Sequence, residues 1–451
     1  MTRYNALAAE MRRALRLGLP LMAAQVLTIA NGVIDTLVAG QIGAKALGAV
    51  AIGAGLVFFI MVAGIGLMAS LSPTMAALRA QGRRRDVGTV FRQGVWMALV
   101  FGLAGFAIVW LAHAAQSIGV DAWGLDQELL PSVHAYLSAA KWSLPPAVLL
   151  LAARNVCEAT GRTRQVLLVQ GIAVLINLIA DLTLGLGIGL ESFGFEPLGI
   201  AGIGWATVVV QSLTCLVLFL LLRRPTFERF ALYRPMERPD SVRLRQLLSM
   251  SAPISLMLMA EAGLFLATAI QMAQFGVTEV SAHNIAVTMT AAFYMLPLGL
   301  SFALTARLSG AFGKHWWPGM RLRALAGLGL TIPLASITAL TLVLFRGPIV
   351  ALFTDEFGVR QLAMHLMLLA AVFQISDALQ ATLIGMLRGL QDTRLPMLIN
   401  LLSYSIGFLV GWSAANLGGF GPAGLWFGLI AGLSVSALLQ GLRLKYLLLS
   451  R

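Results

Sequence analysis

The sequence is poor in charged residues and in cysteine, and each shortage excludes a class of protein. Only 11% of its 451 residues are charged, 59% are hydrophobic and the mean hydropathy is +0.85. A soluble domain usually contains about 25% charged residues, so a soluble globular protein is excluded. The two cysteines, Cys157 and Cys215, lie in different apolar segments without a CxxC spacing, which argues against a disulfide framework and against a thiolate metal site.

The sequence also contains no motif for a nucleotide or a metal. The glycine-rich run from Gly185 to Gly189 follows no strand pattern and precedes no lysine, whereas a phosphate-binding loop needs both features. We interpret these glycines as helix-packing residues. None of the five histidines has a second metal ligand at a useful spacing. We therefore expect no cofactor, no bound nucleotide and no enzymatic activity.

Long apolar runs dominate what the sequence does contain. A helix needs about 20 apolar residues to cross a bilayer, and runs of roughly this length recur twelve times. They lie at residues 15–31 (continuing to about 43), 49–78, 90–116, 129–157, 165–190, 198–222, 247–275, 281–312, 324–350, 358–387, 395–417 and 422–449. The first run is too long for a signal-peptide core, so we expect it to be retained. The pattern predicts an all-α, multi-pass membrane protein with twelve transmembrane helices.

The basic residues predict how the chain is oriented in the membrane. With a cytoplasmic amino terminus, only four of the 32 Lys and Arg residues fall on the outer side, namely Lys45, Lys141, Arg346 and Arg360. This is the positive-inside pattern, and it places both termini in the cytoplasm. The net charge of +13 is thereby accounted for, and basic runs such as Arg83–Arg85 require no nucleic acid partner.

The chain also contains an internal repeat. When the sequence is aligned with itself so that Pro20 falls on Pro253, identical residues also coincide further along. This shift, called the first offset, places Gln41 on Gln274, Gly43 on Gly276, Ala49 on Ala282 and Ile52 on Ile285. A slightly shorter second offset places Gly161–Arg164 on Gln391–Arg394. Each half therefore holds six spans, and because six is even, both halves begin in the cytoplasm. The two halves of such a parallel repeat are related by rotation about an axis along the membrane normal.

The repeat defines the predicted domains. We expect two six-helix lobes related by pseudo-two-fold symmetry, at residues 1–223 and 246–451. A polar, proline-containing cytoplasmic linker at residues 224–245 joins them.

Four polar residues in the first lobe form a candidate ion site. Asp35 lies well inside the first apolar run, where a charge costs about 2.5–3.5 kcal/mol on insertion scales and usually marks an ion or substrate path. Asn177 and Asp181, four residues apart, share one face of the fifth span, and Thr207 lies at similar depth on the sixth. Their oxygen atoms suit Na+ or a shared proton. The alternative interpretation is a set of acids paired for packing alone.

The second lobe contains a separate group of polar residues. Glu261 lies near mid-membrane on the seventh span, and Asp377 lies on the tenth, one turn after Phe373. We expect these two acids to bind a cation, again Na+ or H+, or a cationic substrate. Tyr294, three residues before Pro297 on the eighth span, is a further candidate because proline frees a backbone carbonyl in a membrane helix. A simple helix bend is the alternative.

Several segments together resemble the multidrug and toxic compound extrusion (MATE) transporters, of the bacterial NorM-type branch. They are Pro20, Gln25, Asp35 and Gly40 in the first span, Arg154-Asn155 with Glu158–Arg164 after the fourth, Met295–Gly299 in the eighth and Leu387–Thr393 after the tenth. The resemblance implies that Asp35 is an essential acid and that Asn177, Asp181 and Thr207 match the amino-lobe cation motif. It further implies that Glu261 and Asp377 form the carboxyl-lobe pair tied to cation coupling. Phe373 departs from the family pattern, in which many relatives carry tyrosine, and so removes a hydroxyl ligand.

The function implied by this resemblance is secondary active multidrug efflux. The chain is expected to export small cationic amphipathic drugs in exchange for Na+ or H+, and both ions suit carboxylates. One alternative is a lipid-linked precursor flippase of the same superfamily, which usually has extra spans and a cationic cavity. Another is a non-transporting membrane scaffold, in which internal Lys or Arg would pair with the acids. We expect no membrane-buried base, and this favours the antiporter over both.

The expected partners and location follow from the same interpretation. They are the drugs and the lipid bilayer, with no nucleic acid and no nucleotide. We expect a monomer in the bacterial inner (plasma) membrane.

Overall fold

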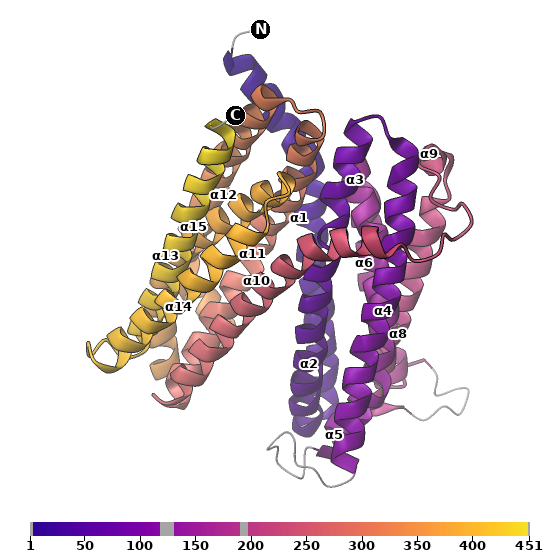
Figure 1. Ribbon diagram of the computed structural model, residues 1–451. Coiled ribbons are helices and arrows are strands. Elements are labelled where there is room, and N and C mark those ends of the chain that lie inside the picture. The colour runs from indigo at the N-terminus through magenta and orange to yellow at the C-terminus, as the bar shows by residue number, and fades with distance from the viewer. Residues whose placement is uncertain (1–2, 118–129, 190–196, 450–451) are drawn as a thin grey trace. The chain divides into compact units, whose positions relative to one another are not determined.

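The structure is entirely helical in the part of the chain that it describes. The computed structural model describes residues 3–117, 130–189 and 197–449, and it assigns no strand in these ranges (Figure 1). The elements of the first half are α1 (Arg3–Ile42), α2 (Ala44–Met68), α3 (Leu71–Ala80), α4 (Arg84–Ser117), α5 (Leu130–Ala140), the 3₁₀-helix η1 (Lys141–Ser143), α6 (Leu144–Thr160), α7 (Thr163–Ala180), the π-helix η2 (Asp181–Gly185) and α8 (Gly199–Leu222). The rest are α9 (Pro225–Glu228), α10 (Ser241–Ala273), α11 (Val277–Phe312), α12 (Trp317–Ala351), α13 (Phe357–Gly389), α14 (Arg394–Asn416) and α15 (Pro422–Leu449).

Twelve helical segments account for the twelve predicted spans. Eleven helices of the described chain are long and apolar enough to cross a membrane. The twelfth is the continuous path α5–η1–α6, which is interrupted near its middle at Lys141–Ser143. Pro145 and Pro146 lie in the first turn of α6. Proline has no N–H group, so these residues interrupt the regular helical backbone hydrogen bonds that continue from α5. The prediction of an all-α membrane protein is confirmed.

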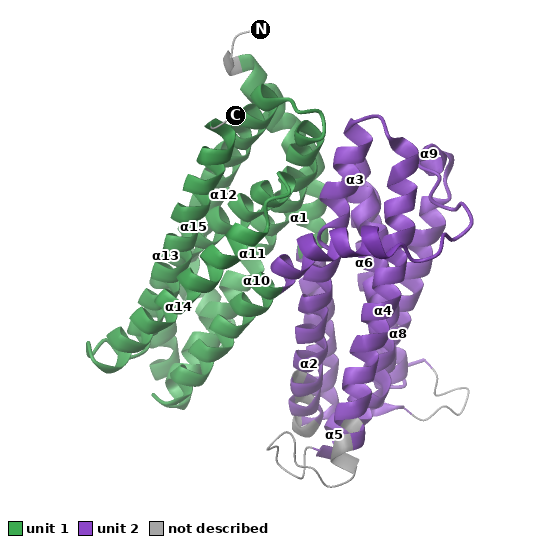
Figure 2. Ribbon diagram, in the orientation of Figure 1, with its two compact units in different colours: residues 1–25, 256–451 green, residues 26–255 purple. Residues whose placement is uncertain are grey.

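The chain packs into two compact units (Figure 2). Unit 1 contains Met1–Gln25 and Leu256–Arg451, and unit 2 contains Val26–Ser255. The units therefore depart from the predicted lobes at residues 1–25 and 246–255, because α1 and α10 each contribute to both units. The functional division into lobes 1–223 and 246–451 with a linker at 224–245 stays a prediction.

Unit 1 holds the first half of α1 through a close helix crossing and a buried ion pair. A Cβ atom on Gly299 of α11 would overlap the Cα atom of Met22 in α1, so only glycine allows the two backbones to approach this closely. Nearer the start of α1, the Arg307 side chain donates from Nε to Oε1 of Glu10 at 2.7 Å. Glu10 is buried, and a buried carboxylate left without a positive partner would be strongly destabilising.

Unit 2 holds the first part of α10 in the same manner. A Cβ atom on Gly66 of α2 would overlap the Cα atom of Ser255 in α10. The Ser255 hydroxyl donates to the Ala63 carbonyl at 3.0 Å, and the Ser251 hydroxyl donates to the Ser70 hydroxyl at 2.5 Å. The first offset of the repeat carries Gly66 to Gly299 and Met22 to Ser255, so the internal repeat is visible in the packing.

Two turns repeat as well. Gly43 and Gly276, matched by the first offset, precede α2 and α11 with φ angles of 141° and 131°, a region that favours glycine. After α6 the Arg162 N–H donates to the Cys157 carbonyl at 2.8 Å, and after α13 the Asp392 N–H donates to the Leu387 carbonyl at 3.0 Å. The second offset relates these two contacts, so α6 and α13 end with the same backbone hydrogen bond.

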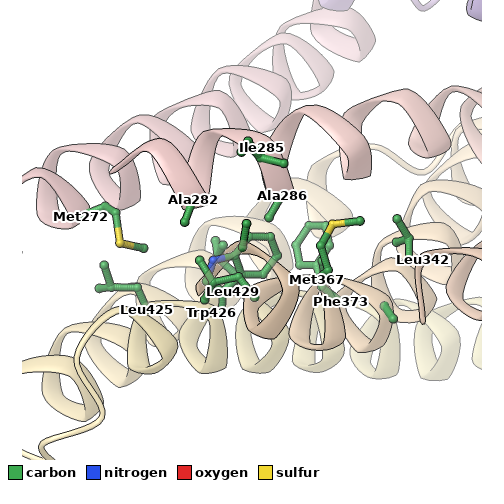
Figure 3. Packing of buried hydrophobic residues seen from close by; sticks show 14 of the residues in the cluster. Met272, Ala282, Ile285, Ala286, Leu342, Met367, Phe373, Leu425, Trp426 and Leu429 are labelled. Atoms are coloured by element: carbon green, nitrogen blue, oxygen red, sulfur yellow. The ribbon is translucent and has the colours of Figure 1, made fainter. Parts of the chain in front are cut away.

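The core of unit 1 surrounds an aromatic cluster (Figure 3). Phe373 of α13 meets Trp426 of α15 edge to face at 5.8 Å and Phe265 of α10 at 6.0 Å between ring centroids. His283 of α11 lies 5.7 Å from Trp426. In unit 2, Cys157 and Cys215 are free and buried, in agreement with a packing role.

Candidate functional site

A buried polar cluster in unit 2 joins α1 to the end of α7. The Asn177 amide donates from Nδ2 to Oδ1 of Asp35 at 2.8 Å and to Oδ2 of Asp181 at 3.2 Å. Asn177 and Asp181 are buried, with exposed fractions of 2% and 0%. Asp181 begins the π-helical turn η2, a local widening of the helix that is frequent at functional sites. The structure thus brings together three of the four residues predicted from the first-lobe sequence.

The cluster has more acceptor oxygens than donors. The carboxyl groups of Asp35 and Asp181 are within hydrogen-bonding reach of each other. Oδ1 of Asn177 and Oδ1 of Asp181 are buried and accept no hydrogen bond from the described residues. The same holds for Oδ1 of Asn31, which lies one turn before Asp35 on α1. Two carboxylates this close repel each other unless a proton or a cation binds between them, and oxygen ligands suit a hard cation.

Thr207 lies beside this cluster without joining its hydrogen bonds. Its hydroxyl donates to the Ile203 carbonyl of its own helix at 3.2 Å, and its side chain interacts with the hydroxyl of Tyr136. Tyr136 of α5 is buried and lies within electrostatic range of Asp35 and Asp181. Gly53 of α2 makes room for the Tyr136 ring, which a Cβ atom at that position would overlap. Sequence reasoning missed Tyr136, since an uncharged residue on another span gives no local signal.

A second polar cluster lies in unit 1 and centres on the hydroxyl of Tyr404 in α14. This hydroxyl donates to Oε2 of Glu261 in α10 at 3.2 Å. It accepts hydrogen bonds from Gln380 Nε2 at 2.6 Å and from Asn400 Nδ2 at 3.0 Å. Glu261 is thereby linked to α13 and α14 through one phenol.

The network continues into α15. The Ser436 hydroxyl donates to Oδ1 of Asn400 at 2.6 Å, and the Gln440 amide donates to the same oxygen. Gln380 also donates to Ser436 at 3.1 Å. All four side chains are buried, and a connected network of this kind restricts the rotamers of its members. The sequence singled out only Glu261 here, because amides and hydroxyls lack the charge that marks an acid in an apolar run.

Asp377 and Tyr294 are electrostatic neighbours of Glu261. The charge of Glu261 acts on Asp377, and Glu261 and Asp377 both act on Tyr294. Asp377 is buried with an exposed fraction of 4%. Among the described residues, no hydrogen bond joins Asp377 to Glu261. One turn before Asp377, both polar atoms of the buried Gln374 amide lack a partner in the described chain, so this stretch of α13 has unused hydrogen-bonding capacity.

Arg388 is a buried base at the end of α13. No base was expected inside the membrane spans, and the tenth span was predicted to end at residue 387; in the structure α13 continues to Gly389, and Arg388 has an exposed fraction of only 8%. Its charge acts on Glu261 and on Tyr294. Arg388 follows Asp377 by eleven residues, which is about three helical turns, so both lie on one face of α13. In the sequence Arg388 falls just after the predicted tenth span at 358–387, on the cytoplasmic side.

Phe373 takes no part in either polar network. Its ring is buried against Phe265 and Trp426, so it supplies no oxygen ligand to Asp377.

The two polar clusters occupy unrelated places in the internal repeat, since the first offset carries Asp35 to Thr268 and Glu261 back to Thr28. Each unit therefore has its own arrangement of acids. The described residues contain no group of three His, Cys, Asp or Glu side chains that could hold a metal ion.

Comparisons with known proteins agree with this architecture. The MatE family model matches residues 20–183 and 253–413, and these ranges begin at the repeated Pro20 and Pro253. The chain is 34% identical over 442 residues to a probable multidrug resistance protein NorM of Xanthomonas axonopodis pv. citri, with 97% of this chain and 94% of the relative covered. It is 31% identical over 444 residues to the multidrug resistance protein MdtK of Yersinia pestis, with 97% and 96% covered.

Solved structures show the same fold. A mutant of the Vibrio cholerae MATE transporter VcmN has a TM-score of 0.87 at 15% identity, with 99% of each chain covered. An outward-facing multidrug resistance MATE family transporter of the MOP superfamily has a TM-score of 0.85 at 16% identity, with 100% of this chain and 98% of that chain covered.

Proposed function

The chain belongs to the MatE family, and from that premise we propose that it is a secondary active multidrug efflux antiporter. It exports small cationic amphipathic compounds in exchange for Na+ or H+. The relatives named as multidrug resistance proteins support the export of drugs. The observation that carries the coupling is the Asn177 amide held between two carboxylates, Asp35 and Asp181, beside buried oxygens that have no donor.

Each cluster has a proposed role. Asp35, Asn177 and Asp181 bind the coupling ion in unit 2, and Thr207 lies at the edge of that site. Glu261 and Asp377 bind a cation or the cationic part of the substrate in unit 1, with Tyr294 beside them. Arg388 tunes this second site, because a nearby positive charge weakens the attraction of an acid for any cation.

Exchange requires that drug and ion favour different conformations. A ligand shifts a conformational equilibrium only by its difference in affinity for the two states, and a shift from 1:99 to 99:1 needs about 5.5 kcal/mol. Neutralising a buried carboxylate removes a repulsion or an unpaired charge, which is the kind of local change that can bias one conformation. Competition between drug and ion for the same acids then couples the two fluxes.

The proposed setting is the bacterial inner membrane. Both termini lie in the cytoplasm, as the distribution of Lys and Arg indicates, and the transporter acts as a monomer. Its partners are the drugs, the coupling ion and the surrounding lipid.

The test is efflux of a cationic dye from proteoliposomes with the sodium and pH gradients imposed separately. Asp35→Asn and Asp377→Asn should each reduce gradient-driven efflux at least tenfold, because an amide cannot exchange a proton or balance a cation. Asp240→Asn is the control, since the Asp240 side chain accepts hydrogen bonds from the backbone at the start of α10 and pairs with the exposed Arg243. Asparagine can replace it at the helix start. Near-normal efflux in both test variants would contradict the proposal.

A further inference from the structure

Unit 2 contains a strongly basic cavity of about 1060 Å³ that has no role in the proposed transport sites. It is formed by the turn before α4, the end of α8 and the segment around α9. Six arginines line it, namely Arg83, Arg84, Arg85, Arg223, Arg229 and Arg234.

The positive charge in this cavity is poorly balanced. The lining includes only two carboxylates, Asp86 and Glu228. Asp86 is bound by Arg83, with 2.6 Å between Nε and Oδ2. Within the described chain, the other five arginines of the lining make no ion pair with a carboxylate. The guanidinium of Arg79, in the last turn of α3, is close enough to Arg229 and Arg84 for their charges to act on it, so like charges crowd together.

Membrane orientation alone does not require this concentration of arginine. The first offset of the repeat carries Arg83–Asp86 to Trp316–Gly319, and the corresponding turn before α12 has no arginine in those four positions. The positive-inside rule depends on the excess of basic residues over all the cytoplasmic loops, which the rest of the chain already supplies. The membrane orientation therefore leaves room for a further role of the arginines in this cavity.

Aromatic rings hold some of these guanidinium groups in place. Arg223 lies over the ring of Tyr233 at 5.3 Å and Arg229 lies over the ring of Phe230 at 5.1 Å. The Tyr233 hydroxyl donates to the Phe219 carbonyl of α8, which ties the segment after α9 to the end of the spanning helix. Phe227 is buried at the wall of the cavity. Of the lining arginines, Arg223 and Arg229 are held in this way, and the planar guanidinium group is suited to bidentate binding of a phosphate.

The position of the cavity indicates where the phosphate comes from. The cavity lies where α4 begins and α8 ends, and both are candidate membrane spans. The ends of membrane-spanning helices come close to the lipid headgroups, and the positive-inside pattern places the turn before α4 on the cytoplasmic side. Basic pockets between transmembrane helices on that side are suited to anionic headgroups. We propose that this cavity binds the phosphate headgroup of an anionic membrane lipid through Arg84, Arg85, Arg229 and Arg234. The site is independent of the proposed efflux activity.

The experiment measures lipid retained by the purified full-length protein in native mass spectrometry. The probes are phosphatidylglycerol and cardiolipin, with phosphatidylcholine as a lipid that has a phosphate but no net charge. The triple variant Arg84→Gln/Arg85→Gln/Arg234→Gln should lose at least fivefold in the retained fraction of both anionic lipids. The matched variant Arg12→Gln/Arg16→Gln/Arg245→Gln removes the same charge from exposed arginines outside the cavity, and it should retain them as before.

Three outcomes would overturn the proposal. The first is an equal loss in the two triple variants, which would mean that the lipids follow net charge. The second is equal retention of phosphatidylcholine. The third is complete displacement of the lipid by millimolar inorganic phosphate, which would make the cavity a site for a soluble anion. If the triple variant does not fold, Arg234→Gln alone should lower retention at least twofold, and Arg234→Lys should recover part of it.

Discussion

Gly66 of α2 lies so close to the backbone of Ser255 in α10 that a Cβ atom at Gly66 would overlap it. The internal repeat reproduces this relationship at Gly299 and Met22. Helices that meet without a side chain between them are held by dispersion contacts and by hydrogen bonds such as the one from Ser255 to the Ala63 carbonyl. The crossing at Met22 holds α1, which carries Asp35 further along the chain. The crossing at Ser255 holds α10 in the same way, and Glu261 follows it in that helix.

We expect Gly66→Ala and Gly299→Ala to lower the thermal stability of the protein in detergent. The new methyl group has no space, and overpacking of this kind costs about 1–3 kcal/mol. Gly171→Ala in α7 is the control, because no atom lies within 4 Å of a Cβ atom there and alanine is the better helix former. A temperature series read by size-exclusion chromatography measures the effect. Equal stability of all three variants would contradict the crossing described here.

We expect Asn177→Ala to slow gradient-driven efflux by about tenfold or more. The substitution removes the amide that lies between Asp35 and Asp181 and leaves the two carboxyl groups without their shared donor. Thr207→Val should have a smaller effect, because the Thr207 hydroxyl donates to the Ile203 carbonyl of its own helix. The measurement is the initial rate of dye efflux from proteoliposomes at matched protein content. A larger loss in Thr207→Val than in Asn177→Ala would reverse the assignment of roles.

The sequence predicted the features that leave a local signal. An acid inside an apolar run identifies Asp35, and a spacing of four residues places Asn177 and Asp181 on one face. Tyr136 and Tyr404 left no such signal, because an isolated phenol on another span resembles an ordinary core residue. Their positions depend on how the helices turn about their axes, which is set by tertiary contacts such as Gly53 against the Tyr136 ring.

Arg388 and the helix crossings show a second limit. A base near the end of a span is normally assigned to the cytoplasmic loop, and only packing around α13 makes Arg388 buried. Likewise, the matching positions of Pro20 and Pro253 revealed the repeat in the sequence. No sequence pattern indicated that α1 and α10 each contribute to both units. Contacts between residues far apart in the chain decide both features.

We expect Tyr404→Phe to destabilise the protein and to weaken the polar network around Glu261. The substitution removes the acceptor for Asn400, one of two acceptors for Gln380, and the donor to Glu261. Each buried group left without a partner costs about 1–3 kcal/mol. Tyr446→Phe is the control, since Tyr446 is exposed. Thermal stability in detergent measures the difference. Identical melting curves for the two variants would show that the hydrogen bonds of Tyr404 are dispensable.

Retention of anionic lipid in the arginine-lined cavity should be nearly constant between pH 7 and pH 10. Guanidinium groups keep their charge throughout this range. Partial burial raises the pKa of Tyr233 to about 12, although the charge of Arg223 acts in the opposite direction. The phenol therefore stays neutral and continues to donate to the Phe219 carbonyl until the pH approaches that value. Native mass spectrometry of the lipid-bound protein across this range measures the retained fraction. A fall of more than twofold by pH 9 would mean that a group titrating near neutrality, and not the arginines, holds the headgroup.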